Sequence, residues 1–287
     1  MSIISNLLER FKKKEISYIT SDDDLKIKLK NVNKEYLIGI DTEFTWRNTY
    51  FPELSLIQIS TLKEIIIIDC LSINDFNGLL KIFKDERIIK IFHSARGDIS
   101  VLNTSLGSKF KNIFDVQLAE NILFPEENLI SYKNIVKRYF YKSISKGETN
   151  SDWNRRPLTQ SQISYASEDV RYLIHIKKNQ EKKLTHQGLS EKYNFILRKE
   201  LSAAETKFGV LRYERFKKKK KNLSKEEKDI FFWRENLAAE KNIPPSFIFK
   251  DSNLKRLKEV IYTKNYSECV WIIKDANFRE NFLTIFK

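Results

Sequence analysis

The sequence has few cysteines and no long apolar run. Of 287 residues only Cys70 and Cys269 are cysteine, and they lie far apart. This excludes a disulfide-rich scaffold and a cysteine-based zinc site. Apolar runs such as residues 65–68 are much too short to cross a bilayer, and the N-terminal region has no apolar stretch of signal-peptide length. We therefore expect a soluble cytoplasmic protein with no membrane partner and no evident obligate protein partner.

Positive charge is what the sequence has in excess. It contains 52 Lys and Arg against 38 Asp and Glu, a net charge of +14, and 41% of its residues are hydrophobic. The hydrophobic content predicts a folded chain, and the length predicts roughly two domains. Basic balance is typical of a protein with a polyanionic partner. A composition rich in Lys, Ile and Asn would produce the same balance without any such partner.

The charge is unevenly distributed along the chain. Residues 206–287 hold 20 basic and 11 acidic residues, and a run of basic residues spans Arg215 and residues 217–221. Such a block is solvated and predicts a linker or an exposed helix end. We expect one domain over residues 1–200, a helical and basic linker over 201–221, and a helical domain over 222–287.

Strands and helices alternate in the first domain. The close spacing of the apolar segments 36–41, 54–60 and 65–69 predicts antiparallel strands. The sequence predicts further strands at 16–20, 90–92 and 112–115, and helices at 22–30, 75–83, 98–106 and 116–124. This order indicates an α/β fold with a mixed sheet flanked by helices.

Two capping boxes predict helix starts in the rest of the chain. Thr159 with Gln162 predicts a long helix over residues 159–183, and Ser224 with Glu227 predicts one that reaches about residue 242. The pair Pro244-Pro245 should end the second helix. Three shorter helices are expected after it, the last over residues 278–286.

Three acidic patterns could carry chemistry. Asp41 and Glu43 follow an apolar strand at positions i and i+2, so they point to one face, where a divalent cation would offset their charge. Asp98 begins a helix after a short strand and a small-residue turn. Tyr165 and Asp169 are i and i+4 on a helix and share a face. Taken alone, each pattern could also be a strand end in solvent, an ordinary first-turn acid or an exposed helical acid.

Their order along the chain resembles the DEDDy 3′→5′ exonucleases, and the flanking residues resemble ribonuclease D. Residues 38–58, 92–98 and 151–173 are similar to the three exonuclease motifs of that family. Residues 233–254 are similar to the small helical HRDC domain that ribonuclease D shares with RecQ-type helicases. The resemblance implies an RNase H-like sheet, the DEDD exonuclease fold, followed by an HRDC-like nucleic-acid-binding domain over residues 222–287. Many family members carry two HRDC-like domains, and this chain has room for one.

The resemblance also implies the site residues. Asp41, Glu43, Asp98 and Asp169 would bind two divalent ions, Mg²⁺ or Mn²⁺, with Asp41 bridging them. Glu43 and Asp169 would hold the ion that activates water, and Asp98 would help to place the second ion. Tyr165 would orient the nucleophilic water. These five residues are the expected catalytic set.

Four further residues are candidates for substrate binding. Phe44 could stack on a terminal base or pack in the core, and His93 could bind substrate or serve the structure. Arg96 could contact phosphate or pair with a carboxylate. Arg156 matches a family position.

The function that the resemblance implies is 3′→5′ exoribonuclease activity. The enzyme would release nucleoside 5′-monophosphates from RNA 3′ ends, especially from tRNA precursors with 3′ extensions. Two alternatives remain at this point. A DNA-directed exonuclease would use the same carboxylates, and a non-catalytic RNA-binding protein would use the fold as a platform.

Overall fold

The chain forms two compact units in a computed structural model. The structure describes residues 14–127, 130–144, 147–204, 207–219 and 223–287. Unit 1 contains the described residues of Met1–Thr45 and Glu53–Glu205, and unit 2 contains those of Trp46–Pro52 and Thr206–Lys287. The short segment Trp46–Pro52 thus belongs with the C-terminal part of the chain, although its neighbours in sequence belong to unit 1.

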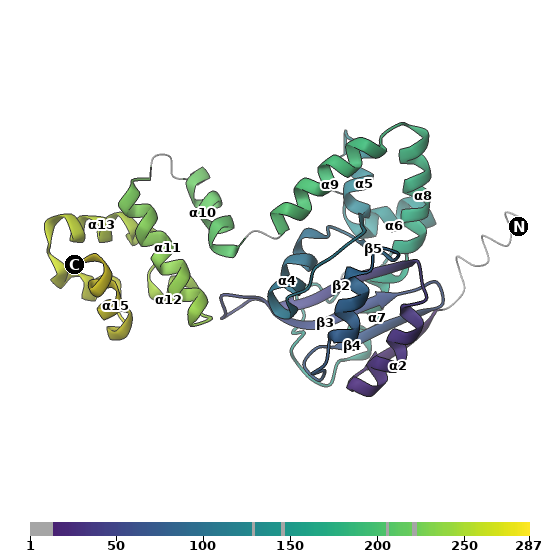
Figure 1. Ribbon diagram of the computed structural model, residues 1–287, viewed down its shortest axis with the longest axis horizontal. Coiled ribbons are helices and arrows are strands. Elements are labelled where there is room, and N and C mark those ends of the chain that lie inside the picture. The colour runs from purple at the N-terminus through teal and green to yellow at the C-terminus, as the bar shows by residue number, and fades with distance from the viewer. Residues whose placement is uncertain (1–13, 128–129, 145–146, 205–206, 220–222) are drawn as a thin grey trace, which may run out of the picture. The chain divides into compact units, whose positions relative to one another are not determined.

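A six-stranded mixed sheet is the centre of unit 1 (Figure 1). Its order is β1-β4-β3-β2-β5-β6. The central strands β2, β3 and β4 are antiparallel, as the sequence predicts, and the other three join in parallel. The strands are β1 (Glu15–Ile19), β2 (Leu37–Thr45), β3 (Glu53–Ser60), β4 (Glu64–Asp69), β5 (Ile89–Phe92) and β6 (Ile113–Asp115).

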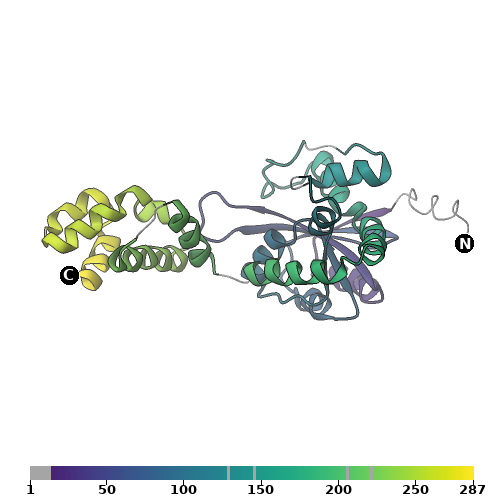
Figure 2. The ribbon, with the colours of Figure 1, turned by 90° about the horizontal axis from the view of Figure 1, so that it is seen from above.

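Helices cover both faces of this sheet, which confirms the predicted α/β class (Figure 2). One buried cluster joins a face of the sheet to α2 (Asp22–Val32), α3 (Asn77–Lys84) and α4 (Arg96–Leu106). A second cluster joins the opposite face to α5 (Val116–Leu123), α6 (Tyr132–Phe140), α7 (Gln160–Arg171), α8 (Leu173–His186) and α9 (Ser190–Ala204).

Strand β2 divides its side chains between these two layers. Ile38 and Ile40 are fully buried in the cluster with α4, and Gly39 and Asp41 face the opposite layer because strand residues alternate. A Cβ at Gly39 would lie 2.6 Å from Ser60 Oγ and 3.0 Å from Leu173 Cβ. Glycine therefore lets the first turn of α8 pack closely against β2.

The prediction of a single long helix over residues 159–183 is wrong. The segment forms α7 and α8, which meet at Tyr172. The Tyr172 N–H donates to the hydroxyl of Tyr132 at 3.2 Å, and the two rings Tyr172 and Phe140 pack with centroids 5.0 Å apart. Contacts with α6 therefore fix the break between the helices. Both predicted capping boxes, at Thr159 and at Ser224, are confirmed.

Unit 2 is helical apart from the segment Trp46–Pro52. Its core combines aliphatic side chains with aromatic rings, and Trp233 packs against both Phe249 and Phe282. Its helices are α10 (Phe208–Lys219), α11 (Lys225–Glu240), α12 (Pro245–Ile248), η1 (Asp251–Asn253), α13 (Leu254–Thr263), η2 (Tyr266–Glu268), α14 (Cys269–Ile272) and α15 (Ala276–Phe286).

The expectation of three helices after the proline pair is wrong, because four α-helices follow α11 in the described chain. Pro245 does not only end a helix but opens α12, in the first-turn position where its missing N–H costs nothing. The structure describes part of the basic run. Arg215 and residues 217–219 lie on α10, and Lys220 and Lys221 lie outside the described residues.

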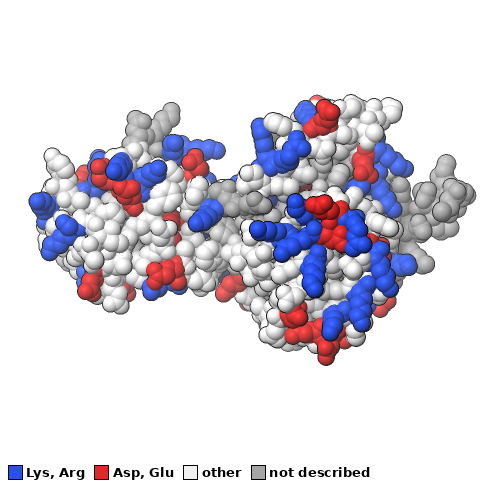
Figure 3. Space-filling model, in the orientation of Figure 1, with Lys and Arg blue, Asp and Glu red and all other residues white. Residues whose placement is uncertain are grey.

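Positive charge is not confined to unit 2. On the face drawn in Figure 3, Lys and Arg side chains are spread over both units. None of the helices in the described part of the chain has the length and apolarity that a bilayer crossing needs.

Candidate active site

Three of the predicted carboxylates meet where β2 faces α7. Asp41 and Glu43 extend from the same side of β2, and Asp169 extends from α7. One carboxylate oxygen of each lies within 4.8 Å of the others. The register of β2 against β3 shifts between Glu43 and Phe44, so a bulge directly follows the second carboxylate. The alternation of β2 and the packing of α7 therefore build one acidic cluster from residues far apart in sequence.

Asp98 reaches the edge of this cluster from α4. Its carboxylate accepts a hydrogen bond from the Thr42 N–H at 3.1 Å and from the Thr42 hydroxyl at 2.6 Å. The side chain is 8% exposed. Its negative charge raises the pKa of Asp41, so the two groups interact even though Asp98 is not in the three-carboxylate cluster. Thr42 was not predicted as a site residue. It is the middle residue of the Asp-x-Glu pattern, and only the approach of α4 shows its role.

Tyr165 lies one helical turn before Asp169 on α7. The capping box fixes the start of this helix, because the Thr159 hydroxyl accepts from the Gln162 N–H and the Gln162 side chain accepts from the Thr159 N–H. The Tyr165 hydroxyl lies 3.3 Å from Thr149 Oγ1. Burial raises the pKa of Asp169, and a hydrogen bond from Tyr165 offsets part of that rise. Burial raises the pKa of Tyr165 to about 12, so its phenol stays protonated at neutral pH. It can therefore donate or accept a hydrogen bond without acting as a base.

The four carboxylates hold protons tightly because they are buried and close together. Burial, then the neighbouring charges of Asp98, Asp169 and Glu43, raise the pKa of Asp41 well above its usual value. Burial likewise raises the pKa of Glu43 to about 9, and the pKa of Asp98 and of Asp169 to about 7 each. Desolvated like charges are costly, and a bound cation would offset them.

This donor set fits a hard divalent cation. Every candidate ligand atom is a carboxylate oxygen, which is the donor that Mg²⁺ and Mn²⁺ prefer. The close spacing of Asp41, Glu43 and Asp169 lets one ion contact all three. The structure therefore contains a candidate metal site at the predicted carboxylates.

The predicted substrate-binding residues have diverse surroundings. Phe44 is partly buried against the apolar cluster beneath α4. The His93 ring packs edge-on against Tyr132, and its Nε2 lies 3.3 Å from the Ile130 carbonyl oxygen. Arg96 lies on the surface, 3.7 Å from Glu200. These contacts favour the structural alternative for His93 and the carboxylate-pair alternative for Arg96, and the role of Phe44 in substrate binding stays a prediction.

Arg156 is engaged within unit 1. Its guanidinium donates to both oxygens of Asp69, at 2.6 and 2.7 Å, and to the carbonyl oxygen of Trp153 at 2.7 Å. The Asp69 side chain is 1% exposed and also accepts a hydrogen bond from Tyr18. These contacts give Arg156 a structural role in holding the segment before α7 against β4. Its contact with substrate stays a prediction.

Comparison with known proteins places this site in a class of nucleases. A family model described as 3′-5′ exonuclease matches residues 16–185, which include all six strands but for the first residue of β1, and all four carboxylates. A curated protein of Desulfotalea psychrophila, named ribonuclease D, is 32% identical over 88% of this chain and 68% of its own length. The chain therefore belongs to the 3′-5′ exonuclease family and, within it, to the ribonuclease D group. This confirms the predicted family and the predicted class of enzyme, a hydrolytic exoribonuclease.

Solved structures agree with this assignment. The crystal structure of Escherichia coli RNase D, described as an exoribonuclease involved in structured RNA processing, has a TM-score of 0.76 and 25% identity over 84% of this chain and 65% of that one. Brucella melitensis NrnC with bound Mg²⁺ has a TM-score of 0.56 and 25% identity over 67% of this chain and 91% of that one. Two further curated relatives, also named ribonuclease D, are matched over 59% and 41% of their own length. Much of those relatives therefore has no counterpart in this match.

Proposed function

We propose that the chain is a 3′→5′ exoribonuclease that trims RNA 3′ ends and releases nucleoside 5′-monophosphates. The observation that carries this proposal is the meeting of Asp41, Glu43 and Asp169 within 4.8 Å, with Asp98 at its edge. The proposed substrates are tRNA precursors with 3′ extensions, in the cytoplasm. The similarity to Escherichia coli RNase D, an exoribonuclease involved in structured RNA processing, supports an RNA substrate.

Two divalent ions are the proposed cofactors, Mg²⁺ or Mn²⁺. Asp41, Glu43 and Asp169 would hold one ion, and Asp41 with Asp98 would hold the other. When bound, such ions supply positive charge to the transition state at phosphorus and lower the pKa of an attacking water. The Mg²⁺ bound to Brucella melitensis NrnC supports a divalent cation in this fold.

The protein's own groups have separate tasks in this proposal. Thr42 fixes the orientation of Asp98 through two hydrogen bonds. Tyr165 remains a neutral phenol beside Asp169, and its hydroxyl would orient the attacking water by hydrogen bonding. Burial of the carboxylates would strengthen each electrostatic contact in the site.

Unit 2 is proposed to bind RNA as an HRDC-like domain. Residues 206–287 carry a net charge of +9, which would supply salt-dependent affinity that does not depend on RNA sequence. Chemistry and affinity would then reside in different units.

The test is incubation of the purified protein with a 3′-extended tRNA, with Mg²⁺ or with EDTA. We expect a ladder that shortens from the 3′ end only with Mg²⁺, and weaker trimming of a DNA strand of the same sequence. The Asp41→Ala and Asp169→Ala variants should show no ladder, whereas Tyr165→Phe should lose rate but keep Mg²⁺ binding by calorimetry. Full activity of either alanine variant, internal cuts, or activity in EDTA would contradict the proposal.

A further inference from the structure

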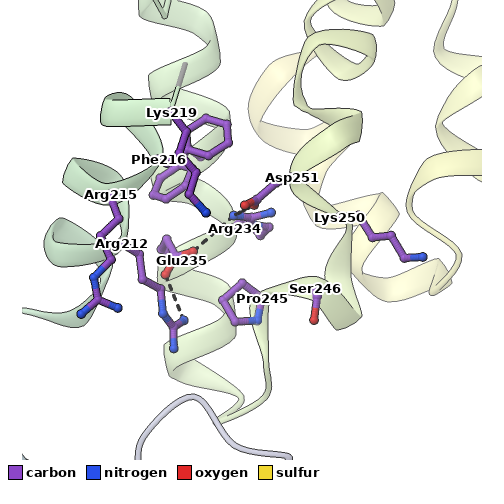
Figure 4. Close-up of a pocket in the computed structure, with 11 residues that line it drawn as sticks. Arg212, Arg215, Phe216, Lys219, Arg234, Glu235, Pro245, Ser246, Lys250 and Asp251 are labelled. Carbon is purple, nitrogen blue, oxygen red and sulfur yellow. Dashed lines mark hydrogen bonds and ion pairs between the residues drawn. The ribbon is translucent and has the colours of Figure 1, made fainter. Parts of the chain in front are cut away.

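Unit 2 contains a basic pocket that the catalytic site does not use. The pocket has a volume of about 420 Å³, in the range of ligand sites in proteins. Figure 4 shows α10 along one side, the segment from Pro245 to Asp251 along the other, and α11 between them. Five basic side chains line it: Arg212, Arg215, Lys219, Arg234 and Lys250.

The two acidic residues of the pocket are already paired. Glu235 lies 3.3 Å from Arg212 and 3.4 Å from Arg234, and Asp251 lies 2.7 Å from Arg234. These contacts neutralise Arg212 and Arg234 within the protein. Arg215, Lys219 and Lys250 are exposed, and none of the three forms an ion pair with any residue that the structure describes. The pocket therefore carries an excess of three positive charges from two opposite walls.

Arg234 is the buried basic residue of the pocket lining. It is 3% exposed, its guanidinium lies over the rings of Phe231 and Phe249, and one terminal N–H donates to the Phe249 carbonyl oxygen. Its Nε–H is buried and has no acceptor within the described residues. A buried donor left unpaired is costly, more so when it is charged. The ion pair with Asp251 and the hydrogen bond to the Phe249 carbonyl oxygen hold the Arg234 guanidinium in this buried position.

The lining favours phosphate over a base. Phe216 and Phe231 are 8% and 2% exposed and stack on each other with centroids 5.4 Å apart. Their faces are therefore occupied by packing and offer little area for a nucleobase. Exposed cations on both walls suit the successive charges of a phosphodiester backbone, which carries no sequence information.

We propose that this pocket binds the phosphate backbone of an RNA strand, with Arg215 and Lys219 on α10 and Lys250 on the opposite wall as its phosphate ligands. That the ligand is RNA rests on the proposed function, and the pocket is the place in unit 2 where the RNA would bind. Arg234 and Glu235 form the floor of the site.

The test compares two double variants of the full chain. Arg215→Ala/Lys219→Ala removes two charges that line the pocket, and Lys217→Ala/Lys218→Ala removes two exposed charges of the same helix that do not line it. Binding of a labelled single-stranded RNA is measured by fluorescence anisotropy in EDTA, so hydrolysis plays no part. A failure of the catalytic proposal would therefore leave this measurement unaffected.

The pocket variant should bind about 10- to 30-fold more weakly near 0.1 M salt. The negative slope of log K against log salt should become smaller in magnitude by about 1.4, or about 0.7 for each lost phosphate contact. The control variant should change affinity by less than about threefold. Circular dichroism and thermal unfolding check that both variants fold. Lys250→Ala, on the other wall, should weaken binding about fivefold and gives an independent measurement. Equal losses in the two double variants, or no loss in any variant, would overturn the proposal.

Two competitors distinguish the source of the phosphate. Inorganic phosphate and a nucleoside 5′-monophosphate should displace the RNA only at millimolar concentration. Displacement by the mononucleotide at micromolar concentration, lost in Arg215→Ala/Lys219→Ala, would show a site for a free nucleotide and would overturn the assignment to an RNA backbone.

Discussion

At the scale of single residues, the acidic cluster is a balance between burial and charge. Packing of α7 onto β2 desolvates Asp41, Glu43 and Asp169 and places them side by side, which raises the pKa of each. Protons and divalent cations can both relieve this repulsion. They therefore compete for the same oxygens, and pH should control the metal affinity.

The stabilisation by Mg²⁺ should increase from pH 6 to pH 9. In the metal-free protein, the raised pKa values, about 7 for Asp98 and Asp169 and about 9 for Glu43, mean that the folded state holds protons which the unfolded state releases near pH 4. These bound protons contribute to the free energy of unfolding. Their contribution is fully present below about pH 4 and is lost as pH rises through 7 and then 9. Mg²⁺ replaces those protons, so the rise in melting temperature that it causes should grow over the same window.

Thermal unfolding with and without Mg²⁺ at each pH measures this effect. Glu43→Gln removes the group with a pKa of about 9, so its response should be smaller and should not grow above pH 8. A Mg²⁺-induced shift that is equal at pH 6 and pH 9 in the unaltered protein would contradict the prediction.

Thr42 should act as a positioning residue. Thr42→Val keeps the shape of the side chain but removes the hydroxyl that donates to Asp98 at 2.6 Å. We expect about a tenfold lower kcat, because a misplaced charge in an active site costs one to two orders of magnitude, and about 1 kcal/mol lower stability. Thr42→Ser retains the donor and should restore most of the rate. A Thr42→Val variant with unchanged kcat and unchanged dependence on Mg²⁺ would leave the threonine without a role in the site.

At the scale of elements, the site depends on how β2 and α7 are held against each other. Gly39 allows the start of α8 to approach β2, and Ser60 on β3 donates to the carbonyl oxygen of Val170 in α7. The segment that leads into α7 is tied to β4 by Arg156 and Asp69. Asp169 therefore reaches the two β2 carboxylates because several contacts fix the helix that carries it.

The Arg156–Asp69 pair should be structural. Arg156→Ala leaves the buried carboxylate without its bidentate partner, which should lower the free energy of unfolding of unit 1 by about 3–5 kcal/mol. Asp69→Ala should have a similar effect, and the double variant should cost clearly less than the two changes added. Denaturant unfolding of all three variants measures this coupling. If Arg156 binds substrate instead, its loss should raise KM and leave stability unchanged, and Asp69→Ala should not share the effect.

At the scale of the whole molecule, two separate segments of the chain belong to unit 2. Trp46–Pro52, between β2 and β3, belongs to unit 2 together with Thr206–Lys287. Tyr50 is 3% exposed, and its hydroxyl donates to Glu235 at 3.1 Å. Asn242 Oδ1 accepts from the backbone N–H of both Tyr50 and Phe51, each at 3.1 Å. Core packing and these hydrogen bonds thus account for the position of Tyr50.

The Asn242 side chain should hold this segment in unit 2. Asn242→Gly removes the acceptor and tolerates the positive φ of 48° at this position, whereas Asn242→Asp keeps an acceptor. The glycine variant should expose the Tyr50 and Phe51 amides to faster hydrogen exchange, by about fivefold for a loss near 1 kcal/mol, and the aspartate variant should change them little. Exchange measured by mass spectrometry tests this. Equal protection in both variants would show that packing alone holds the segment.

Several features of the chain follow from sequence alone because they depend on neighbours a few residues apart. Strand alternation places Asp41 and Glu43 on one face, helix periodicity places Tyr165 above Asp169, and Thr159 and Ser224 each cap a helix through a residue three positions on. These local rules predict the α/β sheet, and the resemblance of three motifs to those of ribonuclease D implies the family.

Only the tertiary structure decides which distant groups meet. The break at Tyr172 depends on a hydroxyl 40 residues away, the orientation of Asp98 on Thr42 depends on a contact across 56 residues, and the hold on Arg156 depends on Asp69, 87 residues earlier. The same is true of Tyr50, whose backbone N–H donates to a side chain 192 residues further along the chain. No local pattern encodes such pairs, because their energy comes from burial that exists only once the elements have packed.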